Sequence, residues 1–194
     1  MAQQSNDLPH REKLSDAKRA LLEKRLRGQV QVHNRVESIS VYKGTDPIPL
    51  SFGQERLFFL HQLNPQSPAY NMYDAVRIQG RLDKSILTET FKFLIRRHPA
   101  FRTSFVVEGD RPWQKVAPEA DFEIPELELQ SGSTADSECS VQELIKTEIC
   151  RPFDLAKSPL LRALLIRQAE EDHILVVTVH HIIFDEWSNE LFWR

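Results

Sequence analysis

Two adjacent histidines followed by an aspartate are the residues of this chain best suited to chemistry. His180 and His181 come directly after a strongly apolar segment, and Asp185 follows four residues after the second histidine. Neighbouring residues of a strand point to opposite faces, so only one of the two imidazoles can face a given cleft. An imidazole at the end of a buried strand is well placed to act as a general base near neutral pH.

The spacing alone leaves three interpretations of this pattern open. Both histidines can have structural roles at the end of a strand. A metal site would use His and Asp ligands, but only one histidine can easily face a common centre and no third ligand lies nearby in the sequence, so no metal is expected. A Ser-His-Asp hydrolase would need a nucleophile elbow of the form Gly-x-Ser-x-Gly, which the chain does not contain.

The segments around the histidines predict both helices and strands. The run Ile174-Leu175-Val176-Val177 is typical of a central strand that is buried on both faces. Ser51 and Asp83 are predicted helix caps, and the helices they start should end before Asn64-Pro65 and at His98-Pro99. A polar loop at 130–137 should precede a helix over 138–150, and strands are predicted at 72–79, 101–108, 112–116, 160–167 and 173–180, with 122–129 as an edge strand. This order predicts an α/β fold, a two-layer α/β sandwich.

The composition excludes several classes of function. Lys and Arg number 25 against 28 Asp and Glu, which gives a net charge of −3, so the overall charge suggests neither nucleic acid nor a membrane surface as a partner. The longest apolar runs are seven or eight residues long, whereas a membrane-spanning helix needs about 20. No apolar signal region follows Met1, so a cytoplasmic location is expected. The two cysteines, Cys139 and Cys150, are too few for a disulfide framework.

The chain divides into four parts by pattern. Residues 1–13 are polar and predicted to be disordered, 14–28 form a basic leader helix, and 29–47 are a linker. The compact part spans 48–194. The last residues resemble the first turns of an amphipathic helix that lacks a stop signal, so we expect the chain to be truncated in a helix after the histidine motif.

Three segments, in the right order, together resemble one known family. The stretch 180–188 resembles the His-His-x-x-x-Asp-Gly signature of nonribosomal peptide synthetase condensation domains, which share the chloramphenicol-acetyltransferase-like fold. The stretch 50–60, Leu-Ser-Phe-Gly-Gln-Glu-Arg-Leu-Phe-Phe-Leu, resembles the opening motif of these domains, and 96–105, Arg-Arg-His-Pro-Ala-Phe-Arg-Thr-Ser-Phe, resembles the second. The segments 152–155 and 159–162 also look familial. The resemblance covers 48–194, and it implies the N-terminal subdomain of the fold, that is, the N-terminal half of the domain only.

The resemblance implies an amide-forming reaction between two carrier-bound substrates. A carrier-bound acyl or peptidyl thioester would be joined to the amine of a carrier-bound aminoacyl group, both held on phosphopantetheine arms, with no cofactor bound directly. The implied partners are carrier protein domains and a C-terminal subdomain, supplied in cis or in trans. By position, His181 matches the catalytic histidine and His180 its structural neighbour. Asp185 matches the aspartate that pairs with the arginine of the opening motif, here Arg56.

One residue departs from the family pattern. Glu186 stands where the family has glycine, and a side chain there is expected to obstruct the substrate path or strain the loop. Glu186, Trp187 and Ser188 are the candidates for lining a substrate tunnel. Because the resembling domains are about twice as long, we expect the chain to be incomplete and inactive alone. The alternatives are a non-catalytic remnant that docks carrier proteins and a stand-alone acyl-CoA-dependent acyltransferase.

Overall fold

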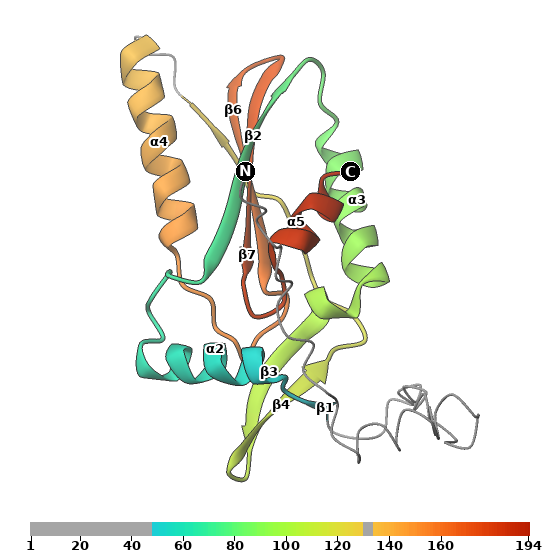
Figure 1. Cartoon of the computed structure of the whole chain (residues 1–194). Helices are drawn as coiled ribbons and strands as arrows, with labels where there is room; N and C mark the ends of the chain where they lie inside the picture. The colour runs from blue at the N-terminus through green and yellow to red at the C-terminus, as the bar shows by residue number, and fades with distance from the viewer. Residues whose placement is uncertain (1–47, 130–133) are drawn as a thin grey trace, which may run out of the picture. The chain divides into compact units, whose positions relative to one another are not determined.

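The computed structural model describes residues 48–129 and 134–194, with the backbone alone at 134–138. All of these residues belong to one compact unit that starts at Thr45 (Figure 1). The predicted disordered segment 1–13, leader helix 14–28 and linker 29–47 lie outside the described residues.

A four-stranded sheet forms the centre of the described unit. Its strand order is β2 (Asn71–Gln79), β7 (Asp172–His180), β6 (Leu161–Ala169) and β5 (Glu126–Glu128). β7 pairs antiparallel with both β2 and β6, so the predicted central strand is confirmed. β5 pairs parallel with β6 at the edge and is shorter than predicted, because Pro125 directly before it has no N–H to donate to a ladder. The register places His180 beside Asn71, at the start of β2.

Helices cover both faces of this sheet. α3 (Lys84–Arg97) and α5 (Glu186–Phe192) pack on one face and α4 (Thr134–Cys150) on the other (Figure 1). The α/β sandwich is therefore confirmed, with the sheet as the middle of three layers rather than one of two. Alternation along the strands produces the two cores, because successive side chains point to opposite faces. The α3 face buries Leu161, Ala163, Leu165, Leu175, Val177 and Val179, and the α4 face buries Leu164, Ile166 and Val176.

A smaller sheet and one helix form the region below the end of β7. The sheet has the order β1 (Ile48–Pro49), β4 (Arg111–Val116), β3 (Thr103–Glu108), and the β3–β4 hairpin turns at Gly109, whose φ is 65°. α2 (Phe52–Leu63) lies beside it (Figure 1). Ile182, just beyond β7, packs in the apolar core that α2 and β3 share. This core therefore holds the loop that follows the two histidines.

The predicted cap residues start their helices as expected. The Ser51 hydroxyl accepts from the Gln54 N–H at 3.3 Å, and the Gln54 side chain accepts from the Ser51 N–H at 3.0 Å, which completes a capping box. Asp83 accepts from the Ile86 N–H at the start of α3. α3 ends at Arg97, with His98 as its C-cap, and the 3-10 helix η1 (Pro99–Arg102) follows. α4 begins at Thr134 and takes in residues predicted as loop, because a polar sequence suits the first turn of a helix as well as a loop.

The helices of the unit are too short or too polar to cross a lipid bilayer. This holds for every helix within residues 48–129 and 134–194.

Candidate functional site

His180 is buried at the end of β7, with 3% of its surface exposed. Its Nδ1 accepts the backbone N–H of Ile182 at 3.1 Å, so in the neutral ring the proton lies on Nε2. The imidazole packs edge-on against the rings of Phe153 and His61. Burial lowers the pKa of His180 to about 4, with smaller contributions from His61, His181 and Arg162. His180 is therefore neutral at pH 7 and serves as a structural acceptor inside the turn.

His181 has the opposite environment. It is exposed, and its backbone N–H donates to the carbonyl of Tyr70 at 2.9 Å. Its Nδ1 lies 2.7 Å from the carbonyl oxygen of Phe184, which can only accept, so Nδ1 carries the proton. In the neutral ring Nε2 is then unprotonated and free to accept a proton. The two histidines of the motif thus hold opposite tautomers, each fixed by a backbone group.

Asp185 caps the helix that follows the histidine turn. Its Oδ1 accepts the backbone N–H of Ser188 at 2.8 Å and the Ser188 hydroxyl at 2.6 Å. These hydrogen bonds lower the pKa of the Asp185 carboxyl. Among the described residues, the hydrogen bonds of the Asp185 carboxylate come from Ser188 rather than from the expected Arg56, which is exposed on α2. The reason is local, because a carboxylate at an N-cap finds donors within its own helix turn.

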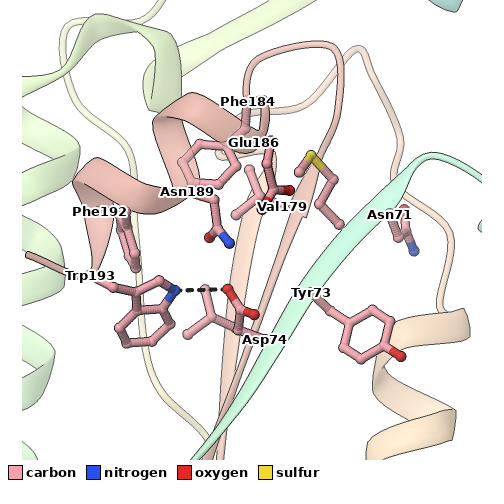
Figure 2. A pocket seen from close by; sticks show the side chains of 11 residues that line it. Asn71, Tyr73, Asp74, Val179, Phe184, Glu186, Asn189, Phe192 and Trp193 are labelled. Atoms are coloured by element: carbon pink, nitrogen blue, oxygen red, sulfur yellow. Dashed lines mark hydrogen bonds between the residues drawn. The ribbon is translucent and has the colours of Figure 1, made fainter.

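Glu186 is the first residue of α5 and faces a pocket beside β2 (Figure 2). This pocket, of about 290 Å³, is also lined by Asp74 and Trp193, whose indole N–H donates to Asp74 at 2.8 Å. The expected loop strain at Glu186 is wrong: its backbone is helical, and no described residue other than glycine has a positive φ. A residue that starts a helix needs no glycine.

The three tunnel candidates point to different places. Ser188 lines an open hollow together with His181, Gly53, Gln54 and Leu57, which lies between α2 and the histidine turn. Glu186 lines the separate pocket at β2, and Trp187 is 70% exposed. Their assignment to a substrate tunnel stays a prediction. Within the described ranges, no group of three or more His, Cys, Asp or Glu residues is arranged to hold a metal ion.

Distant residues support the histidine turn in ways that the sequence does not predict. The side-chain amide of Gln54 donates to the carbonyl of Ile182 at 3.3 Å. The capping-box spacing predicts the contact of Gln54 with Ser51, but this second contact joins residues 128 positions apart. Tyr70 contributes only a backbone carbonyl, for which the type of its side chain gives no signal.

Lowering the pH from 7 to 4.5 should destabilise the chain through His180. The unfolded chain takes up a proton at an imidazole pKa near 6.5, whereas the folded chain does so only near 4. The stability contributed by the neutral His180 is therefore complete above pH 6.5 and is lost as the pH falls towards 4, by up to about 3 kcal/mol. Urea unfolding at pH 7.0, 5.5 and 4.5 measures this loss.

The matched variant is His180→Asn, whose side-chain oxygen can still accept from Ile182 but does not titrate. Its unfolding free energy should fall less between pH 7 and 4.5 than that of the unchanged chain. His61→Gln separates the other histidine of this cluster, because burial also lowers the pKa of His61. Identical pH dependence in His180→Asn and the unchanged chain would contradict the assignment.

Comparison with known sequences relates this chain to one family. The family model described as condensation domain matches residues 45–194. Bacitracin synthase 2 of Bacillus licheniformis is 43% identical over 137 residues, which are 71% of this chain and 5% of that protein. The phosphinothricin tripeptide synthetase of Streptomyces viridochromogenes is 35% identical over 181 residues, covering 93% of this chain and 17% of the synthetase.

Solved structures show the same fold. The starter condensation domain of rhizomide synthetase superimposes with a TM-score of 0.69 at 23% identity, over 77% of this chain and 36% of that domain chain. The first condensation domain of the calcium-dependent antibiotic synthetase, solved with a substrate analogue, gives a TM-score of 0.68 at 21% identity over the same shares. This chain thus spans about a third of the solved chains and a small part of the synthetases. Since the family model covers more than half of it, the chain belongs to the condensation domain family.

Proposed function

We propose that this chain supplies the histidine-bearing part of a domain that forms an amide bond between two carrier-bound substrates. The observation that carries the proposal is the tautomer of His181. Its Nδ1–H is held by the carbonyl of Phe184 at 2.7 Å while the ring is exposed. A neutral imidazole held in this way presents an unprotonated Nε2, which is what a general base or an acceptor that orients an amine requires.

The proposed reaction step is the attack of an amine on a thioester. The amine nitrogen of the acceptor aminoacyl group forms a bond to the thioester carbonyl carbon of the donor, and the carbon–sulfur bond breaks. The proton lost by the amine passes to Nε2 of His181 and from there to the departing phosphopantetheine thiolate. Because a free amine has a pKa near 8, orienting the amine can contribute as much as removing its proton.

The partners proposed for this reaction are carrier protein domains and the remainder of the domain. The support is that the relatives are large synthetases and that this chain spans 36% of the solved condensation domain chains. The hollow beside His181 is open in the described unit. We propose that the remaining part of the domain covers it and completes the substrate path.

The test uses a complete condensation domain that contains this chain. The donor is an acyl group on one carrier protein, and the acceptor is an aminoacyl group on a second. Mass spectrometry of the acceptor carrier should show the acylated product with the complete domain and none with the 194-residue chain alone. Product formation by the chain alone would contradict the part-domain proposal. Equal rates with acyl-CoA and acyl-carrier donors would favour a stand-alone acyltransferase instead.

A further inference from the structure

Gln54 joins three separate parts of the unit through one side-chain amide. Its Oε1 accepts the backbone N–H of Ser51 at the start of α2. Its Nε2 donates to the carbonyl of Ile182 and to Oε1 of Gln114, both at 3.3 Å. Gln114 in turn donates to the carbonyl of Pro49 at 2.9 Å. One amide therefore connects α2, the small sheet and the histidine turn.

The orientation of this amide is determined by its backbone partners. The Ser51 N–H can only donate and the Ile182 carbonyl can only accept, so a rotated amide would lose both hydrogen bonds. The same reasoning applies to Gln114, because its acceptor must face Gln54 and its donor must face Pro49. Glutamine at position 54 is the side chain that presents an acceptor and a donor to these two groups at once.

The Ile182 carbonyl belongs to the turn that carries His181. Several backbone groups of this turn find partners within it or next to it. The Tyr70 carbonyl accepts the His181 N–H, and Nδ1 of His181 binds the Phe184 carbonyl. His180 accepts the Ile182 N–H with its Nδ1 and the Ile183 N–H with its carbonyl. The Ile182 carbonyl instead receives its hydrogen bond from α2. The side chain of Ile182 is buried, and its backbone directly follows that of His181, so Gln54 and the apolar core both hold the residue next to the exposed imidazole.

We propose that Gln54 is a positioning residue of the condensation reaction, which holds the imidazole of His181 in place through the carbonyl of Ile182. The proposal rests on the proposed function, because it concerns the same histidine. It predicts that Gln54 affects the chemical step and not the binding of the carrier-bound substrates. A loss of position by about 1 Å at a catalytic group can lower a rate by about 100-fold.

The variant Gln54→Glu separates positioning from helix capping. A glutamate retains the acceptor for the Ser51 N–H and suits the capping box, but it places a second acceptor against the Ile182 carbonyl. In a complete domain, kcat should fall by about 10- to 100-fold while KM for both loaded carriers stays within about twofold. Gln54→Met, which has no side-chain donor and no charge, is the second variant and should show the same change.

Ser51→Ala is the control for helix stability. It removes the hydroxyl that caps α2, a loss that should be visible as a lower midpoint of urea unfolding. It leaves the contact between Gln54 and Ile182 in place. Because Ser51 also lines the hollow beside His181, the kcat of this variant per folded molecule is compared with those of the Gln54 variants, and it should fall less than in either of them.

Combining Gln54→Glu with His181→Asn decides between positioning and general damage. A residue that acts through His181 has no further effect once the imidazole is gone, so the double variant should react as slowly as His181→Asn alone. An equal additional loss in the double variant, or an unchanged kcat in both Gln54 variants, would overturn the positioning role. If His181→Asn itself reacts at the normal rate, the proposed function fails, which is a separate outcome.

Discussion

His181→Asn in a complete condensation domain is expected to lower the rate of amide formation by about 10²- to 10⁴-fold, the usual contribution of a positioned general base. Asparagine is chosen because its side-chain N–H can still donate to the Phe184 carbonyl, as Nδ1 of the imidazole does. The turn is therefore kept while the Nε2 acceptor is removed. The measurement is the single-turnover rate with both carrier proteins loaded, so that carrier binding does not limit the result.

Folding should be almost unaffected by this change. His181 is exposed, and exposed substitutions change the free energy of unfolding by no more than about 0.5 kcal/mol in most cases. The comparison variant His180→Asn replaces the buried imidazole instead. It should lower the free energy of unfolding, and it should lower the rate of amide formation less than His181→Asn does. A His181→Asn domain that reacts at the normal rate would remove Nε2 from the mechanism.

Arg162→Met is expected to destabilise the described unit by about 3–5 kcal/mol, the usual effect of breaking a buried ion pair from one side. The side chains of Arg162 and Glu148 are 15% and 11% exposed, and the guanidinium lies 2.8 Å from the carboxylate. The guanidinium also donates to the carbonyls of Arg151 and Pro152, at 2.7 and 3.3 Å. It lies over the ring of Phe153 at 3.8 Å.

Truncation at Arg162 would remove the buried donor of Glu148 and of these carbonyls. Glu148 would keep only the more exposed Arg151, at 3.2 Å, and the Arg151 carbonyl would keep the side-chain amide of Asn71, at 2.9 Å. Because Phe153 also packs on His180, the damage should reach the histidine turn. Urea unfolding of Arg162→Met against the unchanged chain measures the loss. The double variant Arg162→Met with Glu148→Met should be more stable than Arg162→Met alone, since an apolar pair leaves no buried carboxylate that has lost its buried partner. If the double variant is the less stable of the two, the ion pair is not the source of the effect.

The surroundings of Arg162 also relate two segments that resemble the family, 152–155 and 159–162. The segment 152–155 supplies Phe153, and 159–162 supplies Arg162, so the two segments meet at one cation–π contact. No local pattern in the sequence predicts this contact between Phe153 and Arg162. The Arg162 guanidinium, on β6, donates to the Glu148 carbonyl near the end of α4. It therefore connects α4 to the strand that pairs with β7.

Local patterns in the sequence were sufficient for most of the elements and for the histidine pair. The capping box at Ser51 and the cap at Asp83 involve residues three positions apart, so their geometry follows from a single helix turn. The apolar run 174–177 predicted a central strand because both faces of such a strand are buried. The sequence predicts that the two imidazoles point to different sides, and one histidine is indeed buried and the other exposed. Only His180 lies on β7, however, and His181 begins the turn that follows it.

Only the tertiary structure decided what each of these residues contacts. The structure contains two sheets, and helices cover both faces of the larger one, which makes three layers. The order of elements in the sequence predicts a sandwich of two layers. The tertiary structure placed Asp185 on its own helix rather than against Arg56, and it brought Gln54 to the histidine turn. The physical reason is that caps and alternation depend on neighbours in the chain, whereas a hydrogen bond between distant segments depends on how their cores pack. The chemistry of His181 belongs to both levels, since the sequence determined the imidazole and the fold of the turn determined which nitrogen is free.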